Sequence, residues 1–297
     1  MNGILVMNKP QGFTSFDVIG KLRGILKMKK LGHTGTLDPM ATGVLPVLAG
    51  TAARACDLLP DETKTYRAAF RLGTVTDTQD STGTVLETHP VSVTAEQITA
   101  LLPDFTGEIQ QIPPMYSAVQ IGGKRLYELA RAGKEIERPA RTVSVERFSL
   151  LHFDAEAGAG EAEIVCGKGT YVRTLLHDVG QKLGCGCCMT ALTRTAACGF
   201  TLAQAHTFEE VQAAADAGNA ESLLIPADTL FPAYPALCLT AAQSVHYQNG
   251  VKLSLRQFSG LRTDGAKPLR VYAADGTFLG LAQADCAEGC LRVLKNL

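Results

Sequence analysis

The hydrophobic positions of this chain recur at two spacings, and the spacing separates the strands it predicts from the helices. Continuous or alternating apolar residues indicate strands, because the side chains of a strand point alternately to its two faces. Runs of this kind predict five strands, at residues 4–7, 44–48, 64–72, 142–151 and 162–166.

Apolar residues three or four positions apart predict the first helix. Ser15 stands at its N-cap position, and Phe16, Ile19, Leu22 and Leu26 share one face. The opposite face carries many of the basic residues of this region, so these are expected to lie on an exposed helix surface.

Three further helices are predicted. Thr94 and Gln97 form a capping box for a helix that reaches about Leu102. The other two cover residues 125–131 and 171–183. The last of them has an apolar stripe made of Val172, Leu175, Leu176, Val179 and Leu183. Arg173 lies off this stripe, where it is either an ordinary surface residue or a partner for a carboxylate or a phosphate.

The pattern changes after Pro235. Short apolar runs are separated there by four dipeptides typical of tight turns, Asn249-Gly250, Asp264-Gly265, Asp275-Gly276 and Glu288-Gly289. This pattern predicts a small, mostly β domain at residues 237–297, which follows a larger domain at residues 1–232.

Composition adds an uneven distribution of charge. The chain has 297 residues, 46% of them hydrophobic, so a packed core is expected. The net charge is −1, but residues 9–30 hold six basic residues against one acid, and residues 124–147 hold seven against four. Both clusters fit either solvated helix faces or contacts with the phosphates of a nucleic acid.

Nine cysteines are present, with neither a signal peptide nor an apolar run of transmembrane length. Free thiols in a reducing cytoplasm are therefore expected, without membrane association. Cys185 and Cys188 have a C-x-x-C spacing, but a second pair at zinc spacing is missing, so no metal site is expected.

Residues 32–46 carry the strongest candidate for chemistry, which is Asp38. Gly35 and Gly43 permit a close approach of the backbone or a positive φ, and Pro39 stiffens the chain directly after the carboxylate. A carboxylate aimed in this way suits a nucleophile or a general base. An ordinary Asp-Pro turn is the alternative.

Two other segments fit contact with a nucleic acid. Lys64 begins a strand that includes Tyr66, whose ring either packs in the core or stacks on a nucleobase. An insertion at about residues 113–143 is stiffened by prolines, hinged by glycines and basic at Lys124 and Arg125. It is interpreted as a mobile clamp on a polyanion, or else as an ordinary surface loop.

Three competing interpretations are weaker. Asp77 and Asp80 suggest a cation site, but further oxygen ligands are missing, so a turn-rich surface loop is expected. The loop after Gly32 is similar to the phosphorylated-aspartate loop of transport ATPases, yet this glycine stands where the acceptor aspartate belongs. A small-molecule hydrolase built on Asp38 and His33 is disfavoured by the basic clusters.

Together these segments resemble the TruB family of tRNA pseudouridine synthases. The shared motifs run in the family's order from residue 3 to about residue 230 and include Asn8-Lys9-Pro10-Gln11-Gly12, Gly32-His33-Thr34-Gly35-Thr36-Leu37-Asp38-Pro39, Lys64-Thr65-Tyr66, Thr76-Asp77-Thr78, Pro113-Pro114, Gly169-Thr170-Tyr171-Val172-Arg173 and Ala191-Leu192-Thr193-Arg194-Thr195. The resemblance implies an α+β fold with a mixed, largely antiparallel sheet flanked by helices. It also implies a small C-terminal β barrel of PUA-like type that binds RNA.

The resemblance further implies roles for single residues. Asp38 is the nucleophile or base, Tyr66 stacks on the target base, and Arg173 pairs with the catalytic carboxylate. Lys9 supports the catalytic loop together with Pro10. Residues expected to take part in RNA binding are His33, Lys9, Lys64, Tyr171, Leu192, Lys124 and Arg125.

The implied reaction is the isomerisation of uridine 55 in the T loop of tRNA to pseudouridine, within a catalytic domain at residues 1–232. The T stem-loop of tRNA is the expected partner, and no obligatory protein partner is expected. Extrusion of the nucleotide costs roughly a few kcal/mol. Attack at C1′ and elimination through a glycal both fit the motif, and neither requires a cofactor. A non-catalytic tRNA-binding or tRNA-folding protein is the alternative.

Overall fold

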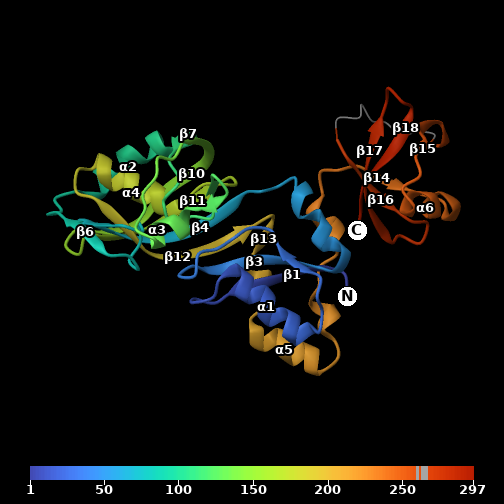
Figure 1. Cartoon of the computed structure of the whole chain (residues 1–297), viewed down its shortest axis with the longest axis horizontal. Helices are drawn as coiled ribbons and strands as arrows, with labels where there is room; N and C mark the ends of the chain where they lie inside the picture. The colour runs from blue at the N-terminus through green and yellow to red at the C-terminus, as the bar shows by residue number, and fades with distance from the viewer. Residues whose placement is uncertain (259–260, 262–266) are drawn as a thin grey trace.

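Two β-sheets organise the chain in the computed structural model, which describes residues 1–258, 261 and 267–297 (Figure 1). Within these residues the larger sheet has nine strands. Seven of them follow one another in the order β1 (Gly3–Lys9), β3 (Thr42–Ala49), β12 (Cys187–Ala197), β4 (Lys64–Leu72), β11 (Ala159–Cys166), β10 (Arg141–Asp154) and β7 (Gly107–Gln111). The short strands β2 (Leu31–His33) and β13 (Phe200–Thr201) pair with β3 and β12.

The pairing of β3 with β12 is parallel, and the other pairs of this sheet in the described part of the chain are antiparallel. The sheet is therefore mixed and largely antiparallel, and helices flank it, so the expected α+β class is confirmed. The loop of residues 34–41 joins β2 to β3 beside the parallel pair, and it carries Asp38.

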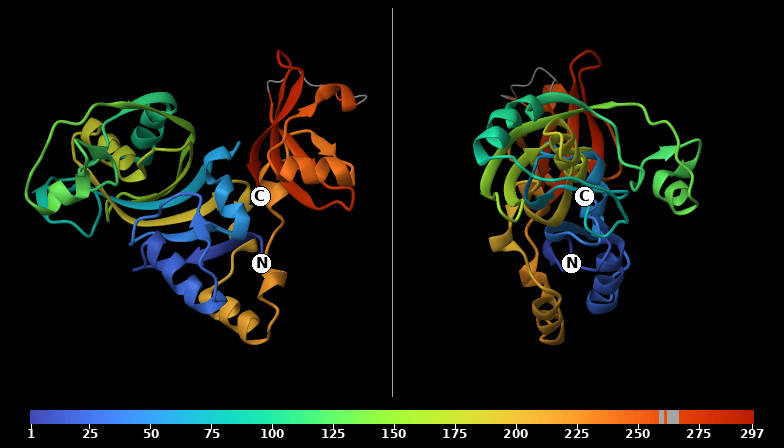
Figure 2. Two further views of the ribbon diagram at one scale, coloured as in Figure 1. Left: turned by 45° about the vertical axis from the view of Figure 1, so that its right-hand side comes forward. Right: turned by 90° about the vertical axis from the view of Figure 1, so that its left-hand side faces the viewer.

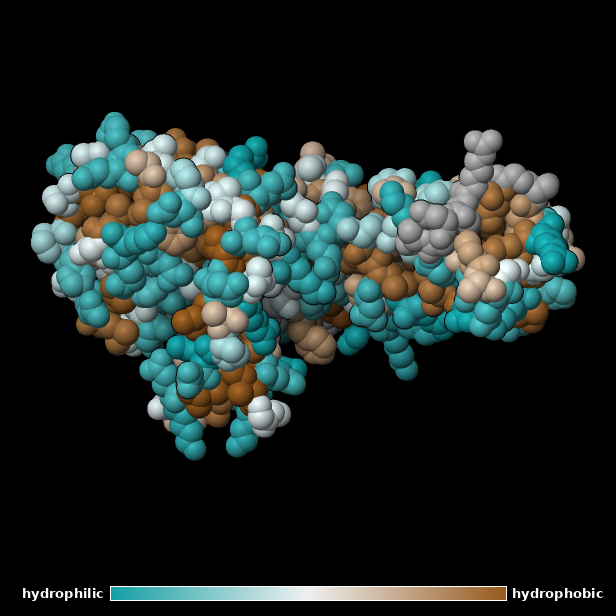
Figure 3. All heavy atoms as spheres, turned by 90° about the horizontal axis from the view of Figure 1, so that it is seen from above, coloured by the Kyte–Doolittle hydropathy of each residue, from teal (hydrophilic) through white to brown (hydrophobic). Residues whose placement is uncertain are grey.

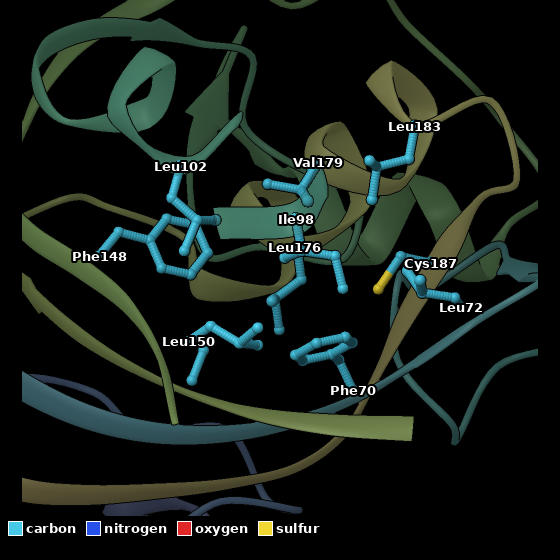
Figure 4. A pocket seen from close by; sticks show the side chains of 11 residues that line it. Phe70, Leu72, Ile98, Leu102, Phe148, Leu150, Leu176, Val179, Leu183 and Cys187 are labelled. Atoms are coloured by element: carbon cyan, nitrogen blue, oxygen red, sulfur yellow. The ribbon is translucent and has the colours of Figure 1, made fainter. Parts of the chain in front are cut away.

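One end of the sheet is covered by α2 (Ala95–Leu101) and α4 (Val172–Lys182). Alternate residues of β4 face these helices, and Figure 4 shows Phe70 among the side chains that pack there. The residues that line this space are Phe70, Leu72, Ile98, Leu102, Phe148, Leu150, Ala162, Leu176, Val179, Leu183 and Cys187. The cavity between them measures about 10 Å³, no more than one water needs, so this region is core.

The other end is covered by α1 (Ser15–Leu26) and α5 (Phe208–Asp216), which lie side by side below β1 and β3 in Figure 1. Thr14 caps α1, because its hydroxyl accepts from the amide of Asp17. The expected cap at Ser15 is therefore wrong by one residue. Phe16 is 68% exposed rather than part of the apolar face, and Val18 takes its place in the core.

The smaller sheet is formed late in the chain. Its described strands follow the order β14 (Ala236–Cys238), β16 (Leu269–Tyr272), β17 (Phe278–Asp285), β18 (Cys290–Asn296) and β15 (Leu253–Ser254). The sheet is curled into a half barrel, as expected of a PUA-like domain (Figure 2). Asp275-Gly276 and Glu288-Gly289 form turns between its strands. Asp264-Gly265 lies outside the described residues.

Asn249-Gly250 does not join two strands, because it ends a helix, α6 (Ala241–Gln248), that the turn pattern did not predict. The C-terminal sheet contacts the rest of the chain through Tyr272, whose hydroxyl donates to Asp228 Oδ2 at 2.8 Å. Figure 3 shows hydrophilic side chains over most of one face of the molecule, with apolar side chains gathered in several patches between them.

The insertion between β7 and β10 contains the short strands β8 (Gln120–Ile121) and β9 (Lys124–Arg125) and the helix α3 (Leu126–Arg131). It projects away from the large sheet in the right-hand view of Figure 2. A second small hairpin, β5 (Thr74–Thr76) with β6 (Val85–Thr88), follows β4.

Among the described residues, every helix is too short or too polar to cross a membrane.

Candidate active site

The backbone around Asp38 is anchored on both sides of the carboxylate. The amide of Leu37 donates to Ser15 Oγ at 2.8 Å, and the Leu37 side chain is buried in the core. The carbonyl of Pro39 accepts from the amide of Gly12 at 2.8 Å. The Asp38 side chain itself is 37% exposed, so a rigid loop presents its carboxylate to a solute.

Lys9 supports this loop from inside the protein. Its side chain is buried, and its ammonium donates to the carbonyls of Phe13 at 2.6 Å, Pro10 at 3.0 Å and Pro39 at 3.4 Å. Burial lowers the pKa of Lys9 to about 8, and Asp38 opposes this effect. Lys9 thus contacts the loop from the interior of the protein, and its side chain has no exposed surface.

Arg173 lies at the start of α4 and forms an ion pair with Asp38. The distance from Arg173 Nε to Asp38 Oδ2 is 2.9 Å. Nη1 donates to the carbonyl of Thr78 and Nη2 to the carbonyl of Tyr116, both at 2.9 Å. Arg173 is only 5% exposed, so it is not an ordinary surface residue. With every nitrogen bonded, its guanidinium holds the Asp38 carboxylate in one orientation.

Asp80 belongs to the same cluster, although the sequence pattern placed it in a surface loop. Its side chain is buried, and Oδ2 lies 3.7 Å from Arg173 Nε. Oδ1 accepts from the hydroxyls of Thr78 at 2.7 Å and Thr82 at 2.5 Å. The sequence did contain a signal for this, because Thr78 and Thr82 flank Asp80 and short polar side chains often form hydrogen bonds within a turn.

Tyr66 and Leu192 lie on adjacent strands near this cluster. Both side chains are buried in the same apolar core as Leu37. Burial raises the pKa of the Tyr66 hydroxyl, and the nearby guanidinium of Arg194 opposes that rise. The structure therefore brings Tyr66, Leu192 and the Asp38 loop together, with the tyrosine protonated at neutral pH.

His33 and Lys64 flank the loop and are partly buried. His33 ends β2, and burial together with the charge of Arg194 lowers its pKa, so its imidazole is neutral at pH 7. Burial also lowers the pKa of Lys64, whose ammonium donates to the carbonyl of Glu62 at 2.5 Å.

Tyr171 holds the start of α4. Its amide donates to Gln111 Oε1 at 2.8 Å, and its carbonyl accepts from Gln111 Nε2 at 3.1 Å. Lys124 and Arg125 stand apart from this group, exposed in the projecting insertion. The insertion nevertheless reaches the site, because the carbonyl of Tyr116 is one of the acceptors of Arg173.

The described residues include no group of three or more histidine, cysteine, aspartate or glutamate side chains able to hold a metal ion. Cys185 and Cys188 are buried free thiols. Desolvation raises the pKa of both thiols. The groups that the structure brings together at the site are a partly exposed carboxylate, a buried guanidinium and a tyrosine side chain.

Comparison with known proteins places this chain in one class, the pseudouridine synthases. The family model of the TruB family pseudouridylate synthase N-terminal domain matches residues 23–172, and that of the tRNA pseudouridylate synthase B C-terminal domain matches residues 173–232. The chain belongs to the TruB family. Asp38 lies within the first match, and Arg173 is the first residue of the second.

Curated relatives agree over nearly the full length. The chain is 44% identical to tRNA pseudouridine synthase B of Thiobacillus denitrificans over 290 residues, which cover 97% of this chain and 94% of the relative. It is 46% identical to the protein of the same name from Levilactobacillus brevis over 266 residues, with 87% and 88% covered. The protein is thus a tRNA pseudouridine synthase, an isomerase.

Solved structures share the fold at lower identity. A Cbf5-Nop10-Gar1 complex contains a chain with a TM-score of 0.72 and 24% identity, and the match covers 95% of this chain and 78% of that one. An H/ACA RNP bound to a substrate RNA containing 2′-deoxyuridine gives a TM-score of 0.73 and 21% identity, with 99% and 84% covered.

Proposed function

We propose that this enzyme converts uridine 55 in the T loop of tRNA to pseudouridine, with Asp38 as the reacting carboxylate. The observation that carries the proposal is the 2.9 Å ion pair between Arg173 and Asp38 on a loop whose backbone is anchored on both sides. The motifs of this loop and the family membership support the choice of target.

The reaction rearranges one nucleotide without an oxidant or a reductant. The bond from C1′ to N1 breaks, the bond from C1′ to C5 forms, the proton on C5 leaves to solvent, and N1 takes up a proton. Asp38 either attacks C1′ or removes a proton from the ribose, and both routes return the free carboxylate. The nucleotide must leave its stack first, because its reacting atoms are covered within the folded loop.

The other site residues take supporting roles in this proposal. Arg173 holds the carboxylate, Leu192 packs against the nucleotide, and Tyr66 contacts the flipped base. The Tyr66 ring is 7% exposed, so the groups that cover it must move when the base enters. His33, neutral and beside the loop, occupies the space near the vacated position in the RNA stack.

The RNA outside the reacting nucleotide is bound by other parts of the chain. We assign the exposed Lys124 and Arg125 of the insertion to phosphate contacts, and Lys64 and Tyr171 to contacts near the site. Residues 1–232 form the catalytic domain, with residues 113–143 as a clamp on the RNA, and residues 237–297 form a second RNA-binding domain. Because its proposed substrate is tRNA, we expect the enzyme to act in the cytoplasm. The similar H/ACA RNP chain is described with a substrate RNA, which supports an RNA-binding surface on this fold.

A tRNA transcript that carries 5-tritiated uridine tests the proposal. The wild-type enzyme should release tritium. Asp38→Ala should still bind the transcript, but its rate of tritium release should be lower by about 10³-fold or more. Asp104→Ala, which removes an exposed carboxylate paired with Lys182, is the matched control and should keep full activity.

The position of the product is mapped by a primer-extension stop after carbodiimide treatment. A stop at uridine 55 is expected, and a stop at another uridine would refute the proposed target. Near-normal tritium release by Asp38→Ala would refute the role of the carboxylate. Salt-dependent binding by the wild type without any release would favour the RNA-folding alternative.

A further inference from the structure

Arg194 is a fully buried cation on an inner strand of the large sheet. It lies on β12, where its backbone pairs with Gly43 of β3 on one side and with Tyr66 of β4 on the other. Its side chain is among the largest in the protein with no solvent exposure. The residue thus stands between the strand that follows the catalytic loop and the strand that carries the tyrosine.

The guanidinium of Arg194 holds the catalytic loop by its carbonyl groups. Nη2 donates to Gly35 at 3.3 Å and Nη1 to Thr36 at 3.4 Å, just before the reacting aspartate. Nε donates to Val44 at 2.7 Å, just after the loop. One rigid, planar group therefore fixes the distance between the two ends of the loop.

The charge of Arg194 has no acidic partner, because none of the ion pairs between described residues includes it. Burial lowers the pKa of Lys9, His33 and Lys64, and the charge of Arg194 lowers it further, so three basic groups lie near this cation beside the Tyr66 hydroxyl and the Cys198 thiol. A buried cation among basic groups opposes folding, and an apolar side chain would fill the same space at lower cost. Stability alone does not account for an arginine here.

The packing around Gly43 makes this arrangement possible. Gly43 has a φ of +105°, and a Cβ at this position would collide with the backbone of Arg194. The close approach of β3 to β12 brings the guanidinium under the loop. Since directly opposed residues on neighbouring strands share a face of the sheet, it also brings the guanidinium beside the ring of Tyr66.

We propose that Arg194 is a positioning residue that sets the conformation of the loop of residues 35–39 and aligns Asp38 with Tyr66. It acts through the backbone and the tyrosine, and it does not touch the reacting atoms. Lys9 anchors the loop after Asp38 and Arg194 anchors it before, so the two buried cations hold opposite sides of one turn. This inference rests on the proposed role of Asp38.

Two substitutions test it. Arg194→Met keeps most of the volume but removes the charge and all three hydrogen bonds, whereas Arg194→Lys keeps the charge but not the planar fork. In the full-length protein, with tRNA at saturation, kcat should fall by about 10²-fold in the first variant and at least about 10-fold in the second, as for misplaced reacting groups. The Kd for tRNA should stay within about threefold of the wild type, because neither variant removes a phosphate contact.

Two controls separate positioning from general destabilisation. Leu48→Ala removes a buried side chain from β3, and Arg67→Met removes an exposed arginine next to Tyr66. Both should keep near-normal kcat at a temperature well below their Tm. If a thermal melt shows that Arg194→Met does not fold, the kcat and Kd of Arg194→Lys are used to test the inference instead.

Three outcomes would overturn the inference. The first is a folded Arg194 variant whose kcat equals that of Leu48→Ala. The others are an Arg194 variant with unchanged kcat but weaker tRNA binding, and a loss of kcat in Arg67→Met as large as that in Arg194→Met. The wild type and Asp38→Ala are run in the same assay. Tritium release by the first and not by the second upholds the proposed function whatever the Arg194 variants show, and no release by the wild type refutes it.

Discussion

Arg173 Nε lies 2.9 Å from Asp38 Oδ2, and the same guanidinium donates to carbonyl oxygens of two other loops. Thr78 supplies one of these acceptors and Tyr116, in the insertion, supplies the other. The orientation of the carboxylate that we propose to react therefore depends on chain segments that are far apart in the sequence. A loop that moves away from Arg173 would release one of its nitrogens and loosen its hold on Asp38.

Arg173→Lys should abolish most activity although it keeps the charge. An ammonium cannot reach the carboxylate and both carbonyls at once, because it lacks the planar fork. We expect kcat to fall by about 10²–10³-fold, the scale of a lost orienting or stabilising group. Tritium release under single-turnover conditions measures this loss, with tRNA binding by filter retention as the control. A kcat within threefold of the wild type, about 0.6 kcal/mol, would contradict it.

Asp80→Asn should reduce activity less than a substitution at Arg173. The change removes a buried charge that faces Arg173 Nε at 3.7 Å, but it keeps the shape that holds Thr78 and Thr82. We expect a fall in kcat of about tenfold, as for a weakened charge partner. Asp77→Asn is the matched control, because Asp77 is exposed in the same loop, and it should stay near the wild type. Equal losses in both variants would point to the loop rather than to the charge.

Removal of the two exposed basic residues of the insertion should weaken binding without changing the chemistry. For the double variant Lys124→Ala, Arg125→Ala we expect a higher Kd for tRNA and an unchanged kcat at saturating tRNA. The slope of log Kd against log salt should fall by about one for each lost phosphate contact. Lys182→Ala removes a basic residue that is paired with Asp104, and its slope should match the wild type. An unchanged slope in the double variant would exclude these residues from the RNA interface.

Asp178 should make the folded state less stable as pH rises. Desolvation raises its pKa to about 6 from 3.8, so between these values the folded chain binds more protons than the unfolded chain. Stability from this group is therefore present below about pH 4 and is lost as pH rises through about 6. Asp178→Asn should remove this fall in stability at high pH. Because solvent partly screens the side chain, we expect the free energy of unfolding at pH 7.5 to rise by about 1–2 kcal/mol.

Urea unfolding at pH 4.0 and pH 7.5 measures this effect. The gain of Asp178→Asn over the wild type should be larger at pH 7.5 than at pH 4.0. Asp216→Asn changes an exposed aspartate at the end of α5 and should show no such difference. A gain that is the same at both pH values would mean that Asp178 is not desolvated in the folded state.

Local patterns predicted the elements whose ends depend on their own residues. The strand expected at residues 64–72 is β4, Lys64–Leu72. The capping box of Thr94 and Gln97 begins α2 as expected, because both of its hydrogen bonds join residues three positions apart. The helix expected at residues 125–131 is α3, Leu126–Arg131, where the amide of Arg125 donates to Glu128 Oε2 at 3.4 Å. Such contacts are encoded within one short segment, so the sequence suffices to find them.

The misplaced residues show where local pattern fails. Phe16 has helical spacing with Ile19 and Leu22, yet it is exposed, because the cap at Thr14 and the packing of α1 on β1 and β3 turn another face inward. Asp80 lies in a polar loop, yet it is buried, because Arg173 arrives from α4 to cover it. Periodicity reports which residues share a face of an element, and it does not report what packs on that face.

The sequence by itself identified the family, because its motifs are short runs of neighbouring residues; the resemblance then implied the class of the fold, and the spacing of the glycines and Pro39 indicated Asp38 as the candidate carboxylate. Only the tertiary structure decided that Asp80 is buried beside Arg173 and that the guanidinium of Arg194 bonds the carbonyls of the loop, and only it gave the 2.9 Å distance between Arg173 and Asp38. These contacts join strands and helices that are distant along the chain. Their distances are set by how the sheet pairs β3, β12 and β4, and that pairing is a property of the whole folded core.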